Sequence, residues 1–482
     1  MPTPSSPGVS FPGASPSDGD SVPPHDRAAG SRRRRWPIFA MAGTAAALLG
    51  WFAYGQIRPP IPFGFFSHPP LYGIWAPTID PLALLVVPAA LLLASVGWLT
   101  TASRRVPTWL TLVLVIAAGL CVAAMGELVR GDWHHLTRDL STSNASPHYA
   151  ADLNFVEEYG VRGFAERRPD LTDDFRSYHS KTHPAGALIL LHALFKLFGA
   201  GHPLRIATVV AGIGLLAAVA AWSMGAALGG ERAGRIAAVL FVAAPGPLML
   251  AYTSMDVVFA TVLAGAGALF MIAIHRSSAA MAAAGGVVLA LGTLLTFATA
   301  FLALAAAITI AIQAPDGRSR LRLLGAATAG GLATLALAWV ALGLDVVSAW
   351  LSAPQSGHPY DPYWIIANPA AVLIYAGLPI AALGIAGLVR RPSQSRRPVL
   401  ILVLCVVMLV WGSLPSEVTD LRPGEVERTW AFLYPMLAAV AGVVVDRWTR
   451  DAGRWRGPTV AALVILAVAQ TVLLHSLWDN LA

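Results

Sequence analysis

Apolar runs recur along this chain from end to end, and their length limits the possible folds more than any other feature. A transmembrane helix needs about 20 mainly apolar residues, and about fourteen runs near or above that length, some short or paired, occur between residues 36 and 476. Only 12% of the 482 residues are charged and 56% are hydrophobic, whereas a soluble protein carries roughly 25% charged residues. We therefore expect an all-α polytopic membrane protein with about 12–14 transmembrane helices.

The net charge of +7 comes mainly from arginines that lie beside apolar runs. The positive-inside rule assigns such basic segments to the cytoplasm. The segments are 32–35, 104–105, 318–322, 390–397 and 447–456. Membrane topology explains this charge better than nucleic-acid binding does. The two cysteines, Cys121 and Cys405, both fall inside apolar runs, so the sequence offers neither a disulfide framework nor a CxxC metal site.

Four regions follow from this pattern. Residues 1–35 are rich in Pro, Ser, Gly and Asp and predict a disordered cytoplasmic tail without a cleavable signal peptide. Transmembrane helices are expected over 36–127, an external loop over 128–183 and a transmembrane helical core over 184–482. Apolar side chains in the loop recur at helical spacing, which indicates an amphipathic helix along the membrane interface. These side chains are Leu153, Val156, Tyr159 and Phe164.

Strict alternation of spans fails between residues 184 and 256. Asp256 lies on the same side as the external loop only if one of the three preceding apolar segments does not span or is a pair of half-helices. The predicted break points are Gly212 with Gly214, or Pro245-Gly246-Pro247. Beyond Asp256 we expect a two-span hairpin over 279–313 and single spans near 321–344, 369–389, 398–414, 430–446 and 457–476.

This topology places four polar segments on the external face: the 152–183 loop, Asp256, the 355–364 loop with Tyr360, and residues 425–430 with Glu427. Acids, histidines and two basic side chains at one boundary between water and lipid indicate a site for an anionic, membrane-anchored substrate. The carboxylates suit a general base or a metal ligand. The phosphate-binding candidates are Arg428, Lys181, His179 and His183.

Short motifs occur in a fixed order along this part of the chain. They read Asp152-Leu-x-Phe, Tyr159-Gly-Val-Arg-x-Phe, His183-Pro-x-Gly, Thr253-Ser-Met-Asp256 and Glu425-Val-Glu-Arg428-x-Trp. The ordered set spans residues 130–440 and resembles the GT-C superfamily of integral-membrane glycosyltransferases, which use polyprenyl-phosphate sugars. It is most similar to poorly characterised actinobacterial members with a His-Pro-Pro-Gly loop.

The resemblance implies roles for three residues. Asp152 matches the catalytic acid that deprotonates the acceptor hydroxyl, with Asp132 and Asp139 as nearer neighbours of the preceding span. Asp256 matches an acid that lines the cavity and in some members helps bind a divalent cation such as Mg²⁺ or Mn²⁺. Arg428 matches a contact to the donor phosphate. The implied reaction is inverting transfer of a sugar from a polyprenyl-phosphate donor to a cell-envelope glycan or lipid acceptor outside the cytoplasmic membrane.

Plainer interpretations stay open beside these roles. Asp152 also fits an exposed acid on an interfacial helix, Arg428 an interface anchor, and Tyr360 an aromatic belt. Glu427 is a further candidate substrate contact. An alternative function is a transporter or flippase for a lipid-linked or small polar substrate, which predicts ionisable residues at mid-membrane and repeated halves. A third is a non-catalytic scaffold for envelope assembly.

Overall fold

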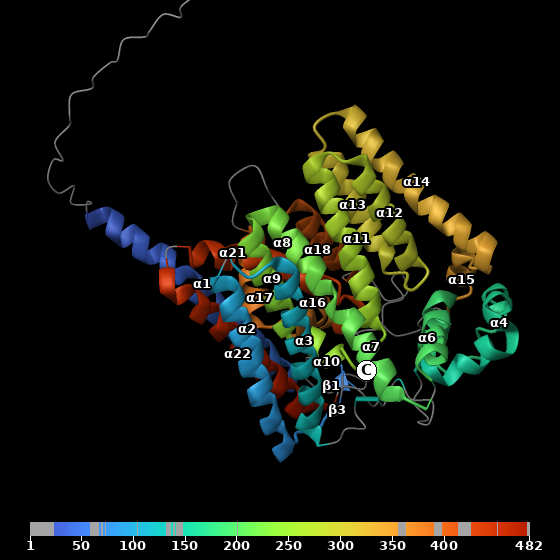
Figure 1. Cartoon of the computed structure of the whole chain (residues 1–482), viewed down its shortest axis with the longest axis horizontal. Helices are drawn as coiled ribbons and strands as arrows, with labels where there is room; N and C mark the ends of the chain where they lie inside the picture. Colours follow the sequence, from blue (N-terminus) through green and yellow to red (C-terminus); the bar gives the residue numbers. More distant parts are fainter. Residues whose placement is uncertain are drawn as a thin grey trace, which may run out of the picture.

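Helices form nearly all of the regular structure of this chain (Figure 1). The computed structural model describes residues 24–57, 67–68, 71–72, 74–103, 105–131, 136–137, 140, 148–199, 201–354, 363–389, 398–412, 426–450 and 452–479. The described strands are short and pair as two antiparallel ladders, β1 with β2 and β3 with β4. Their bounds are Ser67–His68, Leu71–Tyr72, Ile74–Trp75 and Trp478–Asp479. The predicted all-α polytopic class is confirmed.

The N-terminal helices begin earlier than the apolar pattern predicts. Helix α1 covers Pro24–Ile57, so residues 24–35 of the predicted tail belong to a helix. Proline suits the first helical position and the following Ala and Arg residues are good helix formers. The short 3₁₀ helix η1 (Pro81–Leu85) leads into α2 (Val86–Ala102), and a tight turn leads to α3 (Thr108–Glu127) and η2 (Leu128–Arg130). Residues 1–23 lie outside the described part of the chain.

The predicted external loop contains the expected amphipathic helix. A 3₁₀ turn, η4 (Tyr149–Asp152), precedes α4 (Leu153–Arg167), and Leu153, Val156 and Phe164 of α4 are buried. The short helix α5 (Tyr178–Thr182) follows, and then α6 (Ala185–Phe198). Helices α4 and α6 contact each other beside the main bundle (Figure 1).

Helix α6, which precedes Asp256, is among the apolar helices that are too short to count as described spanning candidates. With 14 residues, α6 is about 21 Å long, shorter than a bilayer core of about 30 Å. Helices α7 (Pro203–Leu215) and α8 (Ala217–Gly229) together form one stretch of 27 residues. The chain then runs back through α9 (Glu231–Ala243) and α10 (Pro245–Leu250). These two helices are separated at Pro245, one of the predicted break points. Helix α11 (Asp256–Arg276) then starts at the end of the bundle where the polar loop lies.

Helices α11 to α14 run up and down side by side (Figure 1). The predicted hairpin over 279–313 is observed as α12 (Ala279–Thr293) and α13 (Thr299–Gln313), and α14 (Gly317–Leu342) follows, leading to α15 (Val346–Leu351). Small residues bring α12 and α14 close together, since a Cβ on Gly286 would collide with the carbonyl oxygen of Ala327. Only 11% of the α14 apolar window is buried, which is expected of a helix that faces lipid.

The segment predicted as one span over 369–389 is broken. Helix α16 (Tyr363–Ala376) and α17 (Leu378–Val389) meet at 115° around Gly377, whose φ of +81° favours glycine. A broken helix leaves backbone groups that lipid cannot satisfy. Gln470 accepts a hydrogen bond from the Leu378 N–H and donates one to the Ile374 carbonyl oxygen, both at 2.8 Å.

The last helices close the bundle around α9, in which Ala233 to Ala243 are all buried. They are α18 (Val399–Gly412), α20 (Val426–Thr429), α21 (Leu433–Trp448) and α22 (Arg456–Leu477), with the 3₁₀ turn η5 (Gly453–Trp455) before α22. Six described helices are long and apolar enough to cross a membrane, and the bent pair makes a seventh candidate. Five shorter apolar helices, α6 among them, accompany these, so the predicted total of about 12–14 spans is reached only when shorter helices are counted as well.

Candidate functional site

A buried ion pair joins two of the polar segments that the sequence predicts to converge. The Arg428 Nε lies 2.8 Å from the Asp256 Oδ2, and each residue is only 8% exposed. Asp256 is the first residue of α11, where the helix dipole favours a negative charge. The Ser254 hydroxyl donates to its carboxylate and accepts its backbone N–H, both at 3.1 Å. Removing one partner of such a buried pair leaves an uncompensated charge.

The ion pair borders a small cavity of about 20 Å³, which is room for about one water-sized group. Its polar walls are His183, Asp256, Thr296, Arg428 and Thr429. Its apolar walls are Phe259, Ala260, Leu263, Ala298 and Phe432. These residues come from four separate segments of the chain, so the cavity has room for a single polar group between an acid, a base and an imidazole.

His183 enters the cavity as a neutral imidazole. Its Nδ1 lies 3.1 Å from the carbonyl oxygen of His179, which can only accept a hydrogen bond. Nδ1 therefore carries the proton in the neutral ring, and Nε2 is the basic nitrogen. Burial lowers the pKa of His183 below its ordinary value near 6.5, and the charge of Asp256 opposes this shift.

Aromatic rings pack around His183. The ring of Tyr149 contacts those of His183 (centroids 5.7 Å apart) and His179 (5.5 Å), and His179 stacks on His148 at 5.3 Å. The ring of Phe259 also packs against the ring of His183, with centroids 5.7 Å apart. The cluster fixes the plane of the imidazole beside the ion pair.

Asp152 holds the turn that carries His179 and His183. It is fully buried, and its two carboxylate oxygens accept hydrogen bonds from the backbone N–H groups of Arg176 (2.8 Å) and Ser177 (2.9 Å). The Ser177 hydroxyl in turn caps α5 by accepting the N–H groups of His179 and Ser180. Asp152 is therefore buried and hydrogen-bonded to the backbone just before α5. This differs from the exposed position that the plainer interpretation assigns to it.

Arg168 holds the other end of the same turn. This arginine is 1% exposed, and its guanidinium donates to the carbonyl oxygens of Ser180 (3.2 Å) and His183 (2.9 Å), and to that of Lys181. It also donates to the Ser352 hydroxyl at 2.8 Å. Burial lowers the pKa of Arg168 to about 10, which leaves it protonated at neutral pH.

The remaining predicted residues take different positions. The Lys181 ammonium donates to the Asp173 carbonyl oxygen at 3.4 Å and does not line the cavity. Glu427 is 4% exposed, and its backbone carbonyl accepts a hydrogen bond from the Tyr434 hydroxyl. Tyr360 lies outside the described residues, as do Asp132 and Asp139. The sequence analysis missed Tyr149 and Arg168, because nothing in the local pattern separates them from other loop residues.

The described residues contain no group of three or more His, Cys, Asp or Glu side chains that could hold a metal ion. Asp256, the predicted ligand, is instead paired with Arg428. A cation beside Asp256 would have to compete with that guanidinium. The described donor set therefore does not fit a divalent cation at this carboxylate.

Comparisons with known proteins give matches to solved structures at low sequence identity. No protein-family model and no curated protein matches the sequence. The fold is similar to crystal structures of the Archaeoglobus fulgidus oligosaccharyltransferase in the apo form (16% identity, TM-score 0.43) and in complex with Zn and sulfate (16%, 0.39). The likeness covers 76% and 75% of this chain but only 56% and 54% of those chains. At these values it bears on neither the activity nor the substrates of this protein.

Proposed function

We propose that this protein is a membrane glycosyltransferase that moves a hexosyl or pentosyl group from a polyprenyl-phosphate donor to a cell-envelope glycan or lipid. The observation that carries the proposal is the cavity between His183, Asp256 and Arg428. Three of the motifs that resemble the GT-C superfamily, separated by many residues in the sequence, each contribute one of these side chains.

The proposed reaction is a single displacement. A hydroxyl oxygen of the acceptor attacks the anomeric carbon while the bond from that carbon to the phosphate oxygen breaks. The phosphate leaves with the bonding electron pair, the acceptor proton passes to a base, and the anomeric configuration inverts. Arg428 suits the stabilisation of the charge that develops on the phosphate, since a preorganised cation in a dry site acts strongly on such charge.

The base is the point on which the geometry and the motif assignment differ. The resemblance assigns it to Asp152, and this remains a prediction. Both oxygens of Asp152 already accept backbone N–H groups, whereas the carboxylate of Asp256 borders the cavity. The geometry therefore favours Asp256 as the base and Asp152 as a positioning residue. No step is assigned to a divalent cation.

Membrane orientation follows from the positions of basic residues. Asp256, Ala298 and Phe432 border the cavity near the starts of α11, α13 and α21. Arg276, Arg318 and Arg447, near the following turns, therefore lie at the other end of the bundle. The positive-inside rule favours a cytoplasmic location for that end. We propose a cytoplasmic N-terminus and a cavity that opens toward the outer face of the cytoplasmic membrane.

The transporter or flippase alternative receives less support. It predicts ionisable residues near the middle of spanning helices. The described buried charged residues lie instead near helix ends or in loops. Examples are Glu127 at the end of α3, Asp256 at the start of α11 and Asp446 near the end of α21.

Transfer from radiolabelled polyprenyl-phosphate sugars tests the proposal. Purified wild-type protein in liposomes is offered each donor with a lipid acceptor fraction, and the anomeric configuration of the product is read by NMR. Asp256→Asn is expected to lower the transfer rate at least about 100-fold, as for loss of a general base.

Asp446→Asn is the matched control, because Asp446 is also a buried acid paired with an arginine, Arg450 at 3.6 Å, but lies at the far end of α21. It should retain wild-type turnover per folded molecule. Absence of product with every donor, from folded wild-type protein that translocates the lipid instead, would reject the enzyme in favour of the flippase.

A further inference from the structure

The hydroxyl of Tyr149 is a buried donor for which the described part of the chain provides no hydrogen-bond partner. Tyr149 is 6% exposed, and its Oη is inaccessible to solvent and has no hydrogen-bond partner among the described residues. An unsatisfied buried polar group of this kind is destabilising. Phenylalanine would fill the same space without that cost, so the hydroxyl suits a partner that the described residues do not provide.

The ring of Tyr149 lies beside the candidate site, although Tyr149 is not among the residues that line the cavity. It packs edge-on against His183 and Phe259, with centroids 5.7 and 6.4 Å away, and both residues line the cavity. The charges of Asp256 and Arg428 are also near enough to act on the phenol. Burial raises the pKa of Tyr149, with a smaller contribution in the same direction from Asp256, so the hydroxyl stays protonated and donates.

We propose that Tyr149 binds substrate, its hydroxyl donating a hydrogen bond to a phosphate oxygen of the lipid-linked donor beside Arg428. This inference rests on the proposed function and adds a residue to it. A phosphate oxygen only accepts hydrogen bonds, which matches a phenol that only needs to donate. The cavity has room for about one such oxygen, so the remainder of the substrate lies outside it.

Tyr149→Phe removes the hydroxyl alone and tests the inference. In ligand-free detergent-purified protein the melting temperature should stay unchanged or rise, because an unsatisfied donor is lost. Polyprenyl phosphate without a sugar should bind about 10- to 100-fold more weakly, the effect of one hydrogen bond to a charged group. Inorganic phosphate is measured in parallel, and a similar loss with it would locate the contact at the phosphate independently of the lipid.

Tyr252→Phe is the control, since Tyr252 is also buried but does not line the cavity. It should leave phosphate binding unchanged. The inference is overturned if Tyr149→Phe binds polyprenyl phosphate like wild type, if it loses affinity only for the sugar-bearing donor, or if it melts at a lower temperature without ligand. Failure of wild-type protein to bind any phosphate lipid would instead overturn the proposed function, and with it this inference.

Discussion

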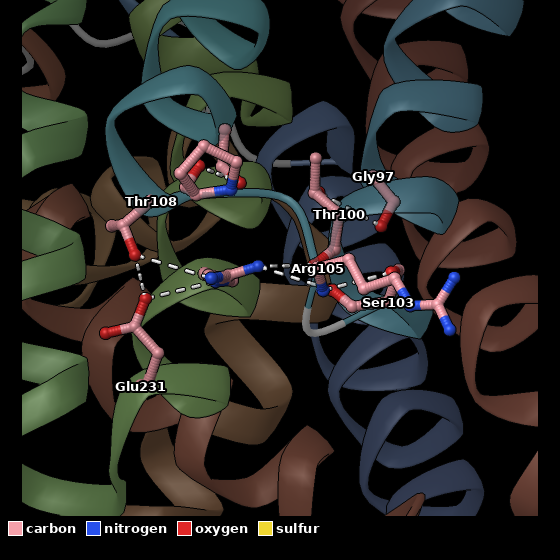
Figure 2. A network of polar contacts seen from close by, with 9 residues as sticks. Gly97, Thr100, Ser103, Arg105, Thr108 and Glu231 are labelled. Carbon is pink, nitrogen blue, oxygen red and sulfur yellow. Dashed lines mark hydrogen bonds and ion pairs between the residues drawn. The ribbon is translucent and has the colours of Figure 1, made fainter.

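Two buried arginines, Arg235 and Arg428, serve this molecule in different ways. Arg235 is 7% exposed and lies at the start of α9, where it joins α2, α3 and their connecting turn. Its Nε contacts Glu231 at 3.1 Å, and its other nitrogens donate to the carbonyl oxygens of Thr100 and Ser103 and to the Thr108 hydroxyl. Figure 2 shows these partners, with Thr108 and Glu231 on one side and Thr100 and Ser103 on the other.

Arg428 has comparable burial and also pairs with an acid, but that pair borders a cavity. Arg235 is enclosed by protein groups that use its donors, so it has a structural task. The comparison teaches that burial and charge pairing alone do not identify a functional arginine. Arg428 differs from Arg235 because its ion pair borders a cavity that His183 also lines, which makes Arg428 the candidate for contact with substrate.

The same substitution at both arginines is the strongest test of this comparison. Lysine keeps the charge but cannot form the planar fork of arginine. Arg428→Lys should lower kcat/KM for sugar transfer about 100-fold or more, because the cation loses its fixed orientation in the site. Arg235→Lys should lower stability by about 1–3 kcal/mol through lost hydrogen bonds. Transfer per folded molecule and thermal unfolding separate the two effects, and equal loss of transfer in both variants would remove the distinction.

Asp152→Asn extends the comparison to a second buried charged residue. It tests whether Asp152 positions the start of α5 and does not itself take part in the reaction. Asparagine keeps one acceptor oxygen but places an NH₂ group against a backbone N–H. We expect about a 10-fold loss of kcat through displacement of α5, with the shape of the pH–rate profile unchanged. Arg168→Lys should give a similar loss, since it disturbs the other end of that turn.

A loss above about 1,000-fold for Asp152→Asn, with disappearance of the acidic limb of the profile, would restore Asp152 as the base. Glu166→Gln is a control on the same loop, because Glu166 forms an exposed pair with Arg162. Its transfer rate should match that of wild type.

The smallest expected effect is a pH dependence of stability at the cavity. Burial lowers the pKa of His183, so between that value and about 6.5 the unfolded chain binds a proton that the folded protein does not. Stability should therefore fall as the pH decreases from about 6.5, by at most about 1.4 kcal/mol per pH unit for one proton. Thermal unfolding of wild type and His183→Gln measures this, and the variant should lack that part of the slope. Identical slopes would show that His183 is protonated in the folded state.

Local properties of the chain made part of this structure predictable. The hairpin over 279–313 and the spans of α2, α3 and α11 follow from apolar length alone. The proximity of Asp256 and Arg428 was predicted on the condition that one apolar segment before Asp256 is not a full span, and both residues lie at helix ends.

Other features depend on the path of the chain in space. The segments that form the short α6 and the bend at Gly377 look like ordinary apolar segments in the sequence. Tyr149 and Arg168 acquire their importance only when the loop folds against α11 and α15. Asp152 was recognised as important, but its hydrogen bonds to the backbone N–H groups of Arg176 and Ser177 could not be predicted from its motif.

The bend between α16 and α17 also constrains how the protein is made. The backbone groups exposed at Gly377 are satisfied by Gln470, a side chain of α22 that is synthesised more than ninety residues later. Until α22 has entered the membrane, lipid offers these groups no substitute. The kinked pair therefore reaches its final form late in biogenesis. A chain whose synthesis stops before α22 lacks the Gln470 hydrogen bonds to Ile374 and Leu378 at the bend.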